Sequence, residues 1–159
     1  MDNNKRNNVT LPDFEMMFRN FRGVEGKWNK AGQRNFCALL TPDQADALKA
    51  DGWNVRCLPK RDEDSEEKPY LPIEVSFKNI PPTIVMKTTE DGSKGVKLDE
   101  EAVSVLDDAE IVEANCIVSP YDWEVNGKSG RKAYLKTLYV TIHTDPFYHR
   151  YLGNDTDDA

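Results

Sequence analysis

Every second residue between Leu71 and Phe77 is apolar, and the residues between them are polar or proline. A period of two predicts a strand with one buried and one solvated face, and this is the clearest strand pattern in the chain. Shorter β-rich patterns predict further strands in segments 14–21, 35–40, 55–58 and 83–87. The chain is therefore predicted to be built mainly from strands.

Two longer β-rich segments, Glu113–Val125 and Ala133–Ile142, lie further along the chain. Asn126-Gly127 lies between them, and both residue types tolerate the positive φ that a tight hairpin turn needs. The two segments therefore predict one long β-hairpin.

Two short helices interrupt the strand pattern. Thr41 is a good helix cap, Pro42 suits the first helical position, and apolar residues follow at helical spacing until Asp51-Gly52. Segment 98–106, which is acidic in its first turn, predicts a second helix. About six strands with one or two short helices favour a mainly β fold with minor α, a small barrel of five to six strands, over an α/β sheet.

The chain has 159 residues, a length that fits one domain. Residues 1–10 are polar and Asn-rich and predict a flexible N-terminal arm, residues 11–150 the domain, and residues 151–159 an acidic C-terminal tail. The three cysteines show no CxxC spacing, and no apolar stretch is long enough for a signal peptide or a membrane span. These features predict reduced thiols and a cytoplasmic location.

The net charge of −7 argues against a polyanionic ligand unless the charge is unevenly distributed. Carboxylates concentrate in Asp62–Glu67, in Asp99–Asp108 and in the C-terminal tail. Elsewhere the balance reverses, because cations outnumber carboxylates in Glu15–Phe36 and in Pro120–Val140. A locally basic groove on an acidic body is therefore possible.

The first candidate binding segment is Asn20–Leu40, in which cations alternate with aromatic residues in a glycine-rich setting. A single strand of nucleic acid needs cations for its phosphates and exposed rings for its bases. Trp28 is the stacking candidate here, and Phe21 and Phe36 are second choices because a place in the core suits them equally well. The phosphate candidates of this region are Arg19, Arg22, Lys27, Lys30 and Arg34.

The second candidate segment is the hairpin itself, Tyr121–Ile142. Tyr121 and Trp123 share one face of the first strand, and Tyr134 lies on the return strand, so these three rings are predicted to stack on bases. The phosphate candidates of the hairpin are Lys128, Arg131, Lys132 and Lys136. The two segments are predicted to form the two walls of one groove.

The hairpin also resembles a known family. A strand, a Tyr-rich segment that begins with Pro-Tyr, an N-G-K-x-G turn and an apolar alternating strand, between Ala114 and Ile142, are similar to the hairpin of phage replicative single-stranded DNA-binding proteins. The resemblance implies an OB-fold, a groove for single-stranded DNA, and an acidic tail that recruits replication or recombination proteins. The tail here lacks the terminal aromatic residue that such tails often bear, and its acidity alone fits a role in solubility equally well.

Motifs of enzymes are absent from the sequence. It contains no HExxH, GxSxG, Walker or GxGxxG motif, and His143 and His149 lack a partner at metal-ligand spacing. We therefore predict no catalysis, no cofactor and no metal. The predicted function is sequence-non-specific binding and protection of single-stranded DNA in phage replication or recombination. The alternative is a protein-interaction module of OB type that recruits replication or recombination partners.

Overall fold

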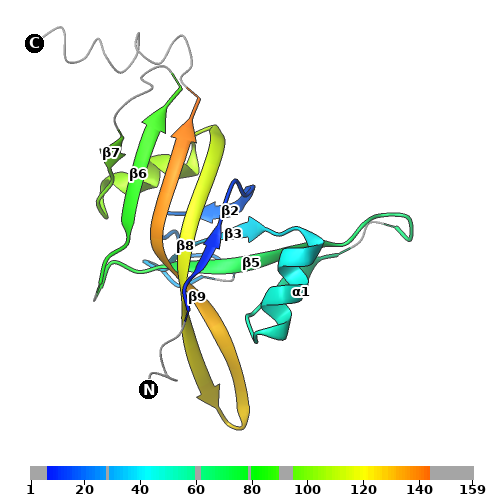
Figure 1. Ribbon diagram of the computed structural model, residues 1–159. Coiled ribbons are helices and arrows are strands. Elements are labelled where there is room, and N and C mark those ends of the chain that lie inside the picture. Colours follow the sequence, from blue (N-terminus) through cyan, green and yellow to red (C-terminus); the bar gives the residue numbers. More distant parts are fainter. Residues whose placement is uncertain (1–6, 28, 60–61, 79, 90–94, 144–159) are drawn as a thin grey trace, which may run out of the picture.

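A computed structural model gives the structure of the protein and describes residues 7–27, 29–59, 62–78, 80–89 and 95–143 (Figure 1). Nine strands form one sheet. They are β1 (Val9–Leu11), β2 (Met16–Asn20), β3 (Arg34–Leu39), β4 (Arg56–Leu58), β5 (Lys68–Val75), β6 (Thr83–Thr88), β7 (Val96–Lys97), β8 (Ile111–Val125) and β9 (Lys128–Ile142). The helices are α1 (Pro42–Ala50) and the 3-10 helix η1 (Ala102–Asp107).

The sheet follows the order β1-β8-β9-β5-β3-β2, with β4 added to β5, β6 added to β9, and β7 added to β6. Strand β9 holds the sheet together, because it pairs with β8 in antiparallel fashion and with β5 and β6 in parallel. Its parallel partner changes from β5, opposite Ala133 and Tyr134, to β6, from Thr137 onward. The register of β8 shifts at Ile117/Val118, close to this change, and such bulges bend a sheet.

The predicted mainly β class with two short helices is confirmed, whereas the prediction of a barrel of five to six strands is corrected. The sheet has nine strands, and within the described residues its path ends at β1 and β2 without closing. Strands β1, β4 and β7 have only two or three residues. A segment that short shows no clear alternation, so the sequence pattern underestimates the number of strands.

The predicted hairpin is confirmed and is longer than expected. Asn126 and Gly127 both have positive φ, 52° and 80°, and the return strand begins directly after them at Lys128 rather than at Ala133. The two strands stay paired down to Val125 and Lys128. The tip of the hairpin therefore extends well beyond the rest of the sheet (Figure 1).

The core lies on one side of the sheet and is covered by η1 and α1. Helix α1 begins with the predicted cap, because the Thr41 side chain accepts from the backbone of Gln44 and the Gln44 side chain accepts from that of Thr41. The rings of Phe14, Phe21 and Phe36 stack in the core at centroid distances of 6.0 and 5.3 Å. Phe21 and Phe36 are fully buried, so the alternative that they stack on bases is wrong.

The first described strand begins before the predicted domain boundary. Val9 and Thr10 were assigned to the N-terminal arm, but they pair with Val118 and Ile117 of β8, because Val9 packs on the core beside Leu11. Residues 1–6 of the predicted arm and the predicted acidic tail lie outside the described residues. No described helix is long and apolar enough to cross a membrane.

Candidate nucleic-acid interface

The register of the hairpin places most of its candidate residues on one face. Tyr121 lies opposite Lys132, Trp123 opposite Gly130, and Ser119 opposite Tyr134. Residues that face each other across an antiparallel pair point to the same side of the sheet. This side is opposite to the one that carries buried Ala133 and Leu135, and we call it the outer face.

Three of these side chains on the outer face contact one another. The rings of Tyr121 and Tyr134 meet edge to face, 5.7 Å apart at an angle of 78°. The Lys132 Nζ lies 5.9 Å from the centre of the Tyr134 ring. Tyr121 is half exposed. The cluster thus offers a ring surface and a cation to a ligand, as stacking on bases beside phosphates requires.

Trp123 lies flat against the opposite strand. A Cβ atom on Gly130 would lie 2.8 Å from Cζ2 of the indole ring and 3.0 Å from its Nε1. Only glycine leaves room for the ring at this point, so Gly130 fixes the position of Trp123 on the outer face.

Glu74 of β5 supports the cluster from the neighbouring strand, since it lies beside Tyr134 in the register of β5 and β9. Its Oε1 accepts from Lys132 Nζ at 3.3 Å. Burial, a hydrogen bond to Glu74 and the charge of Glu74 raise the pKa of Tyr134 to about 12. Glu74 therefore orients Lys132 and holds the Tyr134 hydroxyl from the side of β5.

Arg131 lies on the opposite face of the hairpin and has acidic partners there. It pairs with Asp122 at 2.7 Å and with Asp51, at the end of α1, at 2.9 Å. Its guanidinium lies 5.9 Å from the ring centre of buried Trp53. A shallow recess beside it is lined by Asp51, Asp122 and Glu124, and also by Trp123 and Gly130. Carboxylates that would repel phosphates therefore lie close to Trp123.

The arginines of the first candidate segment serve the fold. Arg19 donates from Nη1 to the carbonyls of Leu106 and Ala109, at 2.8 and 2.6 Å. Arg22 pairs with Asp108. Arg34 pairs with Glu100 at 3.0 Å and donates to the Phe21 carbonyl at 2.9 Å. The acidic segment around η1 thus neutralises the local positive charge that the sequence shows.

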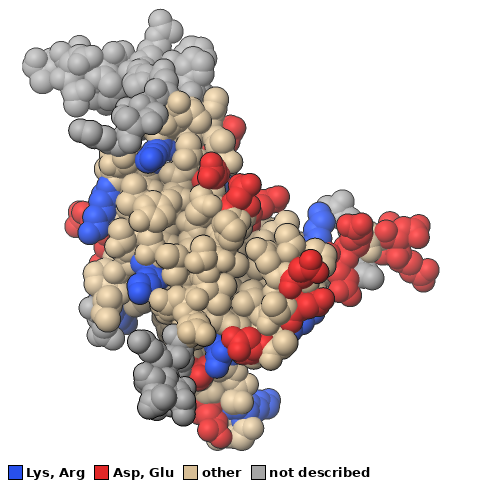
Figure 2. Space-filling model, viewed as in Figure 1, with Lys and Arg blue, Asp and Glu red and all other residues tan. Residues whose placement is uncertain are grey.

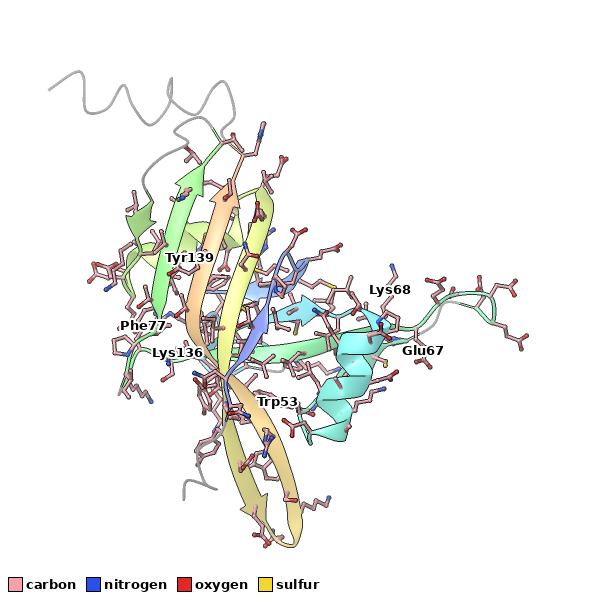
Figure 3. The ribbon with its side chains drawn as sticks, viewed as in Figure 1. Trp53, Glu67, Lys68, Phe77, Lys136 and Tyr139 are labelled. Atoms are coloured by element: carbon pink, nitrogen blue, oxygen red, sulfur yellow. The ribbon has the colours of Figure 1, made fainter. Side chains whose placement is uncertain are left out.

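The remaining candidates are less constrained. Lys27 and Lys30 are exposed in the loop between β2 and β3, and Trp28 lies outside the described residues. Lys128 lies at the hairpin turn, and Lys136 lies further along β9 (Figure 3). Both are exposed and have no ion-pair partner within the part of the chain that the structure describes.

Two aromatic residues on the outer face were missed by the sequence analysis. Phe18 is largely exposed on β2 and its ring contacts that of Tyr70 on β5. Buried and half-buried residues alternate along β5. When this alternation is extended from Leu71 to the preceding residue, it places Tyr70 on the outer face. Phe18 gives no such signal, because its exposure depends on a bulge in β2.

Comparison with known proteins decides the assignment. The family model described as "Putative phage ssDNA-binding domain" matches residues 1–158. The chain belongs to this family. Single-stranded DNA binding, predicted from the sequence, is thereby confirmed as the function, as is the suspected phage family.

Solved structures agree with the assignment at the level of the fold. The C-terminally truncated single-stranded DNA-binding protein from bacteriophage Enc34 matches with a TM-score of 0.53 at 10% identity, over 88% of each chain. The same phage protein in complex with ssDNA matches with a TM-score of 0.52 at 10% identity, over 88% of this chain and 89% of that one. A search of curated protein sequences finds no significant match.

Proposed function

We propose that the chain binds single-stranded DNA on the outer face of the β8–β9 hairpin, without sequence preference and without catalysis. The observation that carries this proposal is the cluster of Tyr121, Trp123, Lys132 and Tyr134, which the hairpin register brings to one face. The matched bacteriophage Enc34 protein, whose fold is similar, has been solved with ssDNA bound.

The chemistry of the cluster favours unpaired bases. Rings that lie on a sheet can stack on any exposed base, and such stacking does not depend on sequence. In a duplex the bases are already stacked on each other, so these rings would gain little. Protection of exposed single strands during phage replication or recombination fits this mode of binding.

The distribution of charge supports the proposal despite the net charge of −7. Acidic side chains are densest on the protruding loop before β5, and both acidic and basic side chains are scattered over the rest of the visible face (Figure 2). The arginines around η1 are paired with carboxylates, and Lys132 is paired with Glu74 at 3.3 Å, whereas Lys128 and Lys136 are exposed on or beside the outer face. The hairpin is therefore the part of the described chain best suited to phosphates.

Fluorescence titration with oligo(dT) tests the proposal. Trp123 should be quenched on binding, whereas Trp53, which is only 4% exposed, provides an internal reference. Trp123→Phe should lose most of the signal that the hairpin contributes. Gel shifts should show preference for the single strand over a duplex of the same length. Equal duplex affinity would contradict the proposal, and complete lack of quenching and shift would favour the protein-interaction module instead.

A further inference from the structure

Phe18 adopts a backbone conformation that its side chain does not favour. Its φ is +51°, in a strand whose register is irregular between Met17 and Asn20. A positive φ in a bulky residue is a true outlier, and residues held in such strained conformations cluster at functional sites. The ring is 59% exposed, so burial in the chain's own core does not compensate for the strain.

The bulge aims Phe18 at a second aromatic ring. The Phe18 and Tyr70 rings meet edge to face, 5.8 Å apart at 72°. Tyr70, Pro72 and Glu74 alternate along β5 with buried Leu71 and Ile73. The Phe18–Tyr70 pair therefore lies on the same outer face as Glu74, which contacts the hairpin cluster, about 13 Å away along the strand.

Two exposed cations accompany this pair. Arg56 of β4 lies directly opposite Tyr70. Lys68 lies opposite Leu58 and two residues before Tyr70, so it points to the same face as Tyr70 (Figure 3). Burial raises the pKa of the Cys37 thiol to about 11, and the positive charge of Arg56 opposes this rise, which places Arg56 near β3. Neither cation has an ion-pair partner among the described residues.

We propose that Phe18, Tyr70, Arg56 and Lys68 form a second nucleotide-binding subsite, so that one strand of DNA runs from the hairpin cluster across β5 to β2. This inference rests on the proposed function and extends it. The separation of about 13 Å corresponds to about four nucleotides at the rise of duplex DNA. The acidic residues Asp62–Glu67 precede β5 and would repel phosphates. We therefore expect the bound strand to end before it reaches them.

Phe18→Asn tests the subsite without damage to the fold. Asparagine tolerates positive φ better than phenylalanine, so the variant should be at least as stable as the wild type in urea. We expect its affinity for a 16-nucleotide oligo(dT), roughly four times the spacing above, to fall about 5- to 100-fold, as loss of one stacked base predicts. An oligonucleotide of about three nucleotides, which is too short to reach from the hairpin cluster to Phe18 at that rise, should bind as in the wild type.

Val96→Asn is the matched control, because Val96 is also 59% exposed but lies on β7. It should leave the affinity for both oligonucleotides unchanged. Unchanged long-oligonucleotide affinity in Phe18→Asn, together with a loss in Trp123→Ala, would overturn the subsite and keep the proposed function. Failure of the wild type to bind either oligonucleotide would overturn both.

Photocrosslinking with oligo(dT) that carries 5-iododeoxyuridine gives an independent measurement. Peptides that contain Phe18 or Tyr70 should crosslink in addition to those of the hairpin. In a separate salt titration, Arg56→Gln should flatten the slope of log K against log salt by the amount that one phosphate contact contributes. Crosslinks confined to the hairpin, with unchanged salt dependence in Arg56→Gln, would show that the DNA does not reach β2.

Discussion

The two segments that look alike in sequence are used in opposite ways by the fold. Glu15–Phe36 and Pro120–Val140 both combine aromatic residues with an excess of cations. In the first, Phe21 and Phe36 enter the core and the arginines bind the segment around η1. In the second, the register of a hairpin places rings and lysines on one exposed face.

The difference shows that local composition does not decide whether a cation is available to a ligand. Arg34 and Lys132 both have an acidic partner. However, Arg34 sits at the edge of the core, where its guanidinium also holds the Phe21 carbonyl, whereas Lys132 lies over an accessible ring. What matters is which distant segment the fold brings beside each cation.

The largest expected effect separates the two segments by stability. Arg19→Ala should reduce the free energy of unfolding by about 2 to 4 kcal/mol, because it removes two charge-assisted hydrogen bonds and leaves two carbonyls without a donor. Arg22→Ala, which removes an exposed ion pair, should cost about 1 kcal/mol or less. Urea denaturation measures both. A stable Arg19→Ala protein that binds DNA weakly would place Arg19 in the interface instead.

A smaller effect is expected on binding. Trp123→Ala should weaken binding of single-stranded DNA by about 1 to 3 kcal/mol, because one stacking ring is lost. Lys30→Ala, an exposed cation of the first segment, should have a much smaller effect. Fluorescence anisotropy of a labelled oligonucleotide compares the two variants. If Lys30→Ala proves the more damaging, the loop between β2 and β3 is the main wall of the groove.

Gly130→Ala tests the same ring without removing it. The new methyl group would lie 2.8 Å from Cζ2 of Trp123, so the indole must shift. We expect Gly130→Ala to weaken binding, but by less than Trp123→Ala does. We also expect the fluorescence of Trp123 to change in the free protein. Wild-type affinity and an unchanged emission spectrum would show that the ring position is unimportant.

The sequence predicted the local elements better than their use. The turn at Asn126-Gly127 and the capped helix at Thr41 follow from local chemistry, so both were found. The side on which Arg131 lies depends on hairpin register together with the position of Asp51, which is distant in sequence. Phe18 was missed because a bulge, which no alternation reveals, turns it outward.

Salt dependence distinguishes the two faces of the hairpin. Lys132→Ala should flatten the slope of log K against log salt by about 0.7, because one phosphate contact of a single strand is lost. Arg131→Ala should leave the slope unchanged, because Asp51 and Asp122 already hold its guanidinium away from the outer face. Titrations from low to high salt measure both. Equal flattening in the two variants would restore Arg131 to the phosphate contacts that the sequence predicted.

The smallest effect concerns pH and the contact between Glu74 and Tyr134. The pKa of Tyr134 is raised to about 12 by burial, then by the hydrogen bond and charge of Glu74. Because this pKa lies above the ordinary value near 10, the protonated phenol stabilises the fold; its contribution is complete below pH of about 10 and is lost as the pH rises through about 12. Glu74→Gln should lower the pKa of Tyr134 only part of the way toward the ordinary value, since burial remains. The ring is uncharged at neutral pH in both proteins, so it can still stack on bases in the variant. NMR of ring-labelled tyrosine, assigned by Tyr134→Phe, measures the shift in each protein. A Tyr134 that titrates near pH 10 in the wild type would mean that Glu74 does not hold the ring, and that the hairpin cluster lacks its support from β5.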